Sequence, residues 1–173
     1  TIGYAASNGT GTYTLIFPTT GYFIPINLSV GTTTATSVQG NTISGIAMSG
    51  AAGGTSSSAP FRGIYVSAGL TTIGDTTSNT IGSQSTTGSI TYTSSSTSAS
   101  DVIGIFNFGS SAWTVSNNTI GGITVANSST GAANIYGIRV NTASGVAFTC
   151  QNNTIGGSVV NSIQSTSTAT GTT

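Results

Sequence analysis

The amino-acid sequence predicts an all-β fold, a solenoid of parallel strands with about four to five repeat units. The first observation is that the phrase Asn-Thr-Ile-Gly-Gly, or a close variant, returns along the chain at residues 41–45, 79–83, 118–122 and 153–157, with Thr-Ile-Gly at 1–3. Between the Thr residues of these copies the spacings are 41, 38, 39 and 35 residues. The second observation is that the segments beside the phrase alternate apolar and polar residues, which is typical of strands.

Two further segments recur at fixed places relative to this phrase. The first is Gly-Ile-x-Val, found at 63–66 and 137–140, with looser copies at 104–108 and 25–28. The second is an apolar strand that runs into the Asn, found at 112–117 and 147–152, with a fainter copy at 35–40. Runs rich in Ser, Thr and Gly separate these segments and indicate turns and loops.

Period-two alternation assigns one side of each strand to the interior. Two isoleucine columns should point inward: Ile26, Ile64, Ile105 and Ile138 in one, and Ile43, Ile81, Ile120 and Ile155 in the other. A third column consists of Val38, Val115 and Cys150, so the cysteine is interpreted as a buried apolar residue. Three inward columns per turn predict a coil with three faces.

Equivalent strands of neighbouring coils pair about 4.8 Å apart, so like residues stack on like. For isoleucine this predicts a continuous apolar core. For the asparagines of the repeated phrase it predicts a ladder of amide hydrogen bonds along the axis, formed by Asn41, Asn79, Asn118 and Asn153. Asparagine also tolerates the left-handed backbone that a sharp corner needs.

The sequence allows either one or two coils in each repeat unit. Each unit is interpreted as one coil with a long third strand and loop. The alternative is two coils per unit, because residues 45–48 and 122–125 also resemble Gly-Ile-x-Val. We expect residues 1–173 to form one β-helix segment of a longer polypeptide or filament, with 1–34 as an irregular first unit or a docking or cap region.

Composition restricts the chemistry. Only 2% of the residues are charged, namely Arg62, Asp75, Asp101 and Arg139, and the chain has no His. Acid–base catalysis, metal sites and nucleic-acid binding all need groups that are scarce here. We therefore expect no enzyme activity, no cofactor or metal, no nucleic acid and no membrane insertion. The two aspartates are interpreted as loop residues, and the two arginines as solvated or packing residues.

Together, Gly-Ile-x-Val, a turn, an apolar strand and Asn-Asn-Thr-Ile-Gly-Gly resemble the right-handed parallel β-helix repeat. The pattern is most similar to the long, Ser/Thr-rich variety in bacterial secreted surface and adhesin-like proteins. The resemblance covers almost the whole chain, most clearly residues 35–160, and implies a right-handed helix at an extracellular or cell-surface location. The units here are longer than the usual coil of that family.

These observations favour a non-catalytic structural segment of an extracellular filament or cell-surface fibre. Its partners would be copies of itself, stacked end to end, because almost no charge opposes association. One alternative is an adhesin-type module that binds glycan or a host surface through the outward aromatics Tyr65 and Phe106. A second is an ice-binding solenoid, although the Thr-x-Thr runs do not recur at one place in the unit. The Ser/Thr-rich loops are also candidates for O-linked glycans.

Overall fold

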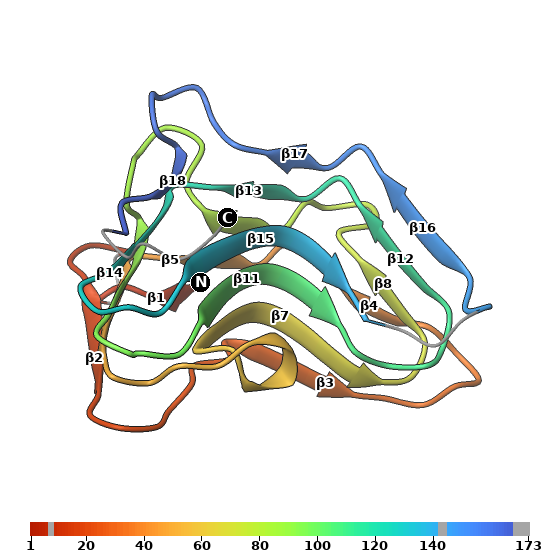
Figure 1. Ribbon diagram of the computed structural model, residues 1–173. Helices are drawn as coiled ribbons and strands as arrows, with labels where there is room; N and C mark the ends of the chain where they lie inside the picture. Colours follow the sequence, from red (N-terminus) through yellow and green to blue (C-terminus); the bar gives the residue numbers. More distant parts are fainter. Residues whose placement is uncertain (7–8, 142–144, 168–173) are drawn as a thin grey trace.

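The chain folds into a parallel β-solenoid in which each full coil contributes one strand to each of four sheets (Figure 1). The computed structural model describes residues 1–6, 9–141 and 145–167. We name the sheets A to D in the order in which the chain first enters them. Every paired strand in them runs parallel to its neighbour.

Sheets A and B have five strands each. Sheet A consists of β1 (Ile2–Gly3), β5 (Thr42–Ser44), β9 (Thr80–Gly82), β13 (Thr119–Gly121) and β17 (Thr154–Ile155). Sheet B consists of β2 (Tyr13–Phe17), β6 (Ile46–Gly50), β10 (Ile90–Ser94), β14 (Ile123–Asn127) and β18 (Ile163–Ser165).

Sheets C and D have four strands each. Sheet C consists of β3 (Ile26–Ser29), β7 (Phe61–Ala68), β11 (Ser100–Asn107) and β15 (Ala133–Val140). Sheet D consists of β4 (Thr36–Val38), β8 (Thr71–Ile73), β12 (Trp113–Ser116) and β16 (Phe148–Gln151). A short 3₁₀ turn, η1 (Ser56–Ser58), lies between β6 and β7.

Each repeat unit forms one coil. Ile81 pairs with Ile43 on one side and with Ile120 on the other, so successive copies of the repeated phrase lie in register. The alternative of two coils per unit is therefore wrong. The extra Gly-Ile-x-Val copies at 45–48 and 122–125 lead into sheet B instead.

The prediction of three faces is also wrong, because sheet B is a fourth face with its own inward column. Ile46, Ile90 and Ile123 occupy that column and are fully buried. The sequence pattern missed it because Ser89, not Gly, precedes Ile90, and because the chain between sheets A and B varies in length.

The two predicted isoleucine columns do line the core. Their members in the middle coils are buried, namely Ile64, Ile105, Ile43, Ile81 and Ile120. Ile26 and Ile138 are half-buried in the outermost strands of sheet C, and Ile155 in β17 is 54% exposed. Each fully buried isoleucine contributes roughly 1.5–3 kcal/mol.

The inward column of sheet D includes a residue that the repeat alignment missed. Ile73 lies between Val38 and Val115, pairs with both and is fully buried. Cys150 continues the column beyond Val115, but the interpretation of a buried cysteine is wrong. It is exposed because β16 is the outermost described strand of sheet D.

The asparagine ladder is present at the corner between sheets D and A. The side-chain amide of Asn41 donates to Asn79 Oδ1 (3.0 Å), Asn79 donates to Asn118 Oδ1 (2.8 Å), and Asn118 donates to Asn153 Oδ1 (2.9 Å). A second amide hydrogen of Asn79 reaches the carbonyl of Val38 (2.8 Å) in the neighbouring coil. The ladder thus satisfies polar groups that the corner buries.

The left-handed backbone of this corner belongs to the residue before the ladder, not to the ladder asparagines. Asn117 has φ 59° and Asn152 has φ 55°, and Gly40 takes the same position with φ 70°. This explains why the chain reads Asn-Asn-Thr-Ile in two coils: the first Asn forms the turn and the second forms the ladder.

Residues 1–34 contribute strands to three sheets. β1 pairs with β5, β2 with β6 and β3 with β7, so the first coil is continuous with the rest of the solenoid. The pairing of β3 shifts register between Leu28 and Ser29. Part of the aromatic-rich run near the N-terminus is β2, an ordinary strand of sheet B.

Candidate functional site

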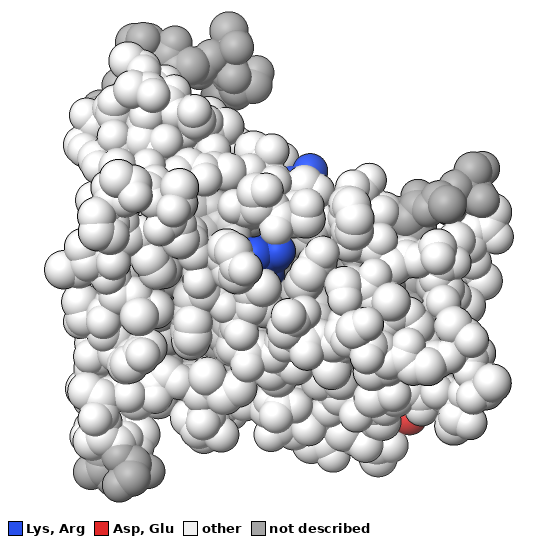
Figure 2. Space-filling view, turned by 90° about the horizontal axis from the view of Figure 1, so that it is seen from below, with Lys and Arg blue, Asp and Glu red and all other residues white. Residues whose placement is uncertain are grey.

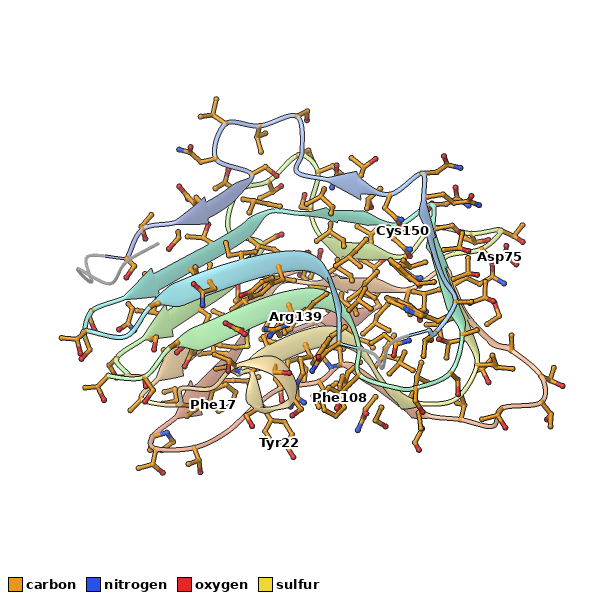
Figure 3. All side chains as sticks on the ribbon, turned by 45° about the vertical axis from the view of Figure 1, so that its right-hand side comes forward. Phe17, Tyr22, Asp75, Phe108, Arg139 and Cys150 are labelled. Atoms are coloured by element: carbon orange, nitrogen blue, oxygen red, sulfur yellow. The ribbon has the colours of Figure 1, made fainter. Side chains whose placement is uncertain are left out.

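Three of the four charged side chains gather on the outer side of sheet C, on three neighbouring strands. Arg62 comes from β7, Asp101 from β11 and Arg139 from β15. Figure 2 views the molecule from a side on which both arginines are visible. Asp75 lies in the turn after β8, at the edge of the molecule and away from Arg139 (Figure 3). The expectation that Asp101 lies in a loop is wrong, because it is a buried strand residue.

Asp101 is held by three partners from two segments, η1 and β15. Its Oδ2 accepts from Arg139 Nη1 at 2.5 Å and from the backbone N–H of Ser56 at 3.1 Å. Its Oδ1 accepts from the side-chain amide of Asn134 at 2.9 Å. Arg139 keeps 24% of its side chain exposed. Both carboxylate oxygens are therefore satisfied, and the aspartate fastens the chain around η1 to sheet C.

Arg62 is buried between two aromatic rings. Its guanidinium carbon lies 4.7 Å from the ring centres of both Tyr22 and Tyr65, and Nη1 donates to the carbonyl of Ser57. Nε has no hydrogen-bond partner among the described residues. Burial lowers the pKa of Arg62, while the two tyrosines oppose that shift.

The aromatics continue this arrangement along the axis. The rings of Tyr65 and Phe106 lie 5.4 Å apart, Phe106 contacts Phe108 at 6.0 Å, and Arg139 lies over Phe106 and Tyr136. We call this group the outer cluster; it consists of Tyr22, Arg62, Tyr65, Asp101, Phe106, Phe108, Tyr136 and Arg139.

Tyr65 and Phe106 do point away from the core, but the interpretation of both as accessible contact aromatics is wrong. Tyr65 is 8% exposed and Phe106 is fully buried, because a long B-to-C connection and neighbouring side chains cover them. The accessible aromatics of the outer cluster are Tyr22, Phe108 and Tyr136. Repeat reasoning could not find these residues, because none of them has a like counterpart in the next coil.

The polar and ring contacts of the outer cluster join segments of the same chain. Its one carboxylate is buried and paired, and its arginines engage aromatic rings and carbonyls of the same chain. Within the described residues no group of three or more His, Cys, Asp or Glu side chains could hold a metal ion.

A second feature is a cavity of 460 Å³ outside the corner between sheets A and B. Uncharged residues line it, most of them small and many bearing a hydroxyl, with Tyr4 as its one aromatic. The residue patterns of the sequence did not indicate this cavity. A signal was available, since the A-to-B connection is one residue in some coils and much longer in others.

The structure and the comparisons with known proteins give no family for this chain. No family model matches it, and neither a curated protein nor a solved structure does. No helix in the described ranges is long and apolar enough to cross a membrane.

Proposed function

We propose that this chain is a non-catalytic structural segment of an extracellular filament or cell-surface fibre, in which solenoid coils associate end to end. The observation that carries the proposal is the likeness of successive coils in sheet A. Thr154 and Ile155 of the last described coil repeat, in register, the Thr119 and Ile120 of the coil before it.

The outermost coil illustrates what such an association would bury. Ile120 is fully buried because β17 covers it, whereas Ile155, its partner in β17, is 54% exposed. The strand edges of β15, β16, β17 and β18 would gain backbone hydrogen bonds from a further coil. With two basic and two acidic residues in the chain, little charge repulsion opposes this contact.

The register also defines how two copies would meet. If the sheets continue from copy to copy, β17 faces β1 and β18 faces β2 of the next copy, which places Gln164 opposite Thr14. Among the described residues, sheets C and D have one strand fewer than A and B, so the joint is complete when a further segment supplies one strand to each. Such head-to-tail contacts do not close on themselves and produce a fibre.

Cross-linking tests this geometry. In a Cys150→Ser background we expect the pair Thr14→Cys and Gln164→Cys to form disulfides between copies, since neighbouring strands bring Cα atoms within disulfide range. A ladder of oligomers on a non-reducing gel is the expected result. The matched control replaces Thr14→Cys by Thr93→Cys, an exposed mid-body position of the same sheet.

Light scattering at rising protein concentration, with electron microscopy of the same samples, provides the second measurement. Ile155→Lys should lower the apparent mass by placing a charge in the joint, and Thr93→Lys should leave it unchanged. A stable monomer at high concentration, with no cross-linking by the Thr14–Gln164 pair, would refute the proposal.

A further inference from the structure

The connections between sheets A and B alternate in length along the solenoid. A single residue, Gly45, joins β5 to β6, and Gly122 alone joins β13 to β14. Longer loops join the other three strand pairs, over residues 4–12, 83–89 and 156–162. Each short corner is therefore flanked by two long loops, one from the coil before and one from the coil after (Figure 1).

Over the short corner at Gly122 the two flanking loops meet. The backbone N–H and the hydroxyl of Ser158 both donate to the carbonyl of Gln84, at 2.8 and 3.1 Å. Thr87 Oγ1 donates to the carbonyl of Val160 at 3.2 Å, and Ser162 Oγ accepts from the N–H of Gly122 at 3.1 Å. This corner is closed by a loop that offers hydroxyls and carbonyls.

Over the short corner at Gly45 the flanking loops leave the cavity of 460 Å³ between them. Its volume is within the usual range of small-molecule sites, about 300–1,000 Å³. The floor is the backbone of β5 and β6 around Gly45, with Ile46 and Ala47. The first loop contributes Tyr4 and Thr12, and the third coil's side contributes Ser83, Thr86, Ser89 and Thr91.

Tyr4 is fixed as one wall. Its backbone N–H donates to the carbonyl of Gly45 at 3.1 Å, and its φ is 58°, a left-handed conformation that a non-glycine residue rarely adopts. Its ring lies against Gly45 so closely that a Cβ on that glycine would overlap it. The ring is therefore held in place before any ligand arrives, which lowers the ordering cost of binding.

We propose that this cavity binds a neutral saccharide. An aromatic ring offers a face for the C–H side of a sugar, and hydroxyls both donate and accept hydrogen bonds, as sugar hydroxyls require. The lining has no charged residue, so it lacks the basic groups that would select an acidic sugar or a phosphate. At the corner over Gly122, the equivalent loop already forms hydrogen bonds with hydroxyls and carbonyls of the loop that closes it.

The test begins with an array of neutral hexose and N-acetylhexosamine oligosaccharides, printed beside sialylated and sulfated ones. The neutral oligosaccharide that gives the strongest signal is then measured by isothermal titration calorimetry. Tyr4→Ala should raise its Kd about tenfold or more, because the stacking face is lost. Tyr22→Ala, an exposed tyrosine of the outer cluster, should leave Kd unchanged.

A second pair of variants shows whether a higher Kd reflects a lost contact with the saccharide or a change in the loop that contains Tyr4. Thr91 and Thr124 occupy the same outward column of sheet B, and Thr91 alone of the two lines the cavity. Thr91→Val should raise Kd about threefold to tenfold by removing one hydroxyl, and Thr124→Val should not. Binding confined to acidic glycans, binding that is lost only in Tyr22→Ala, or no binding to any neutral saccharide would overturn the proposal. None of these outcomes bears on end-to-end stacking.

Discussion

Both faces of the two middle strands of sheet C, β7 and β11, are largely buried, but they are built in opposite ways. On the inner face, Ile64 and Ile105 stack on each other as like residues in register. On the outer face, the neighbouring residues Tyr65 and Phe106 belong to a set of unlike side chains held by an ion pair, ring contacts and a returning connection. The inner face is stabilised by packing of like residues that recur in each coil. The outer face depends on an ion pair and ring contacts that each occur once.

The largest expected effect is on the inner face. Ile105→Asp places a carboxylate in a fully buried column without a partner, which should cost on the order of 5 kcal/mol of unfolding free energy. Urea unfolding followed by circular dichroism measures it. Ile16→Asp, at an exposed position of β2, is the control and should stay near the parent. A variant of Ile105 that unfolds like the parent would contradict the face assignment.

On the outer face, Asp101→Ala should cost about 3 kcal/mol, because it leaves the N–H of Ser56 and the amide of Asn134 without their acceptor and removes the ion pair with Arg139. The partial exposure of Arg139 limits the loss. Asp75→Ala, which removes an exposed acidic side chain from a turn, should change stability by less than about 0.5 kcal/mol. Equal unfolding midpoints for the two variants would show that the contacts of Asp101 in the outer cluster do not stabilise the fold.

The ladder allows a comparison of the same residue type in two settings. Asn79→Ala in a middle coil should cost about 2 kcal/mol, since Asn79 both donates to Asn118 and accepts from Asn41. Asn153→Ala, at the last described rung, should cost about half as much because no described asparagine lies beyond it. Thermal unfolding of both variants measures the ratio, and an inverted order would argue against a cooperative ladder.

The smallest effect concerns Tyr92, which lies between Met48 and Val125 in an inward column of sheet B and whose hydroxyl donates to the carbonyl of Ala52. Burial raises the pKa of Tyr92 above its ordinary value of 10.0, so the unfolded chain loses this proton at lower pH than the folded one. Its contribution to stability is complete below pH 10 and falls as the pH rises through and above that value. Between about pH 10 and 12, the unfolding free energy of Tyr92→Phe should therefore fall less steeply with pH than that of the parent.

The sequence was sufficient for the features that recur at a constant distance from the repeated phrase. The phrase around Ile43, Ile81 and Ile120 specifies strand register, the inward columns and the asparagine ladder, because parallel coils place equivalent residues over one another. What it could not specify was what occurs once. Tyr65 and Phe106 were correctly placed on the outer side, but their burial depends on the connection over residues 51–60, which is longer than the equivalent connections over 95–99 and 128–132.

The fourth sheet was missed for a related reason. A column is recognised when its residues keep a constant distance from the repeated phrase, and the chain from Ile81 to Ile90 is longer than the chain from Ile43 to Ile46. The cavity beside Gly45 follows from the same variation in length. A comparison of connection lengths between coils, rather than of residue types, would have indicated both.

The ladder finally gives the molecule a direction. In each of its three amide-to-amide hydrogen bonds, the asparagine nearer the N-terminus donates and the asparagine of the following coil accepts, so the ladder is not symmetric along the axis. A fibre grown from such segments would have two chemically distinct tips, because the donors and acceptors of the ladder follow one order along the axis. Subunits would then join in one orientation only, and the two tips would lengthen at different speeds.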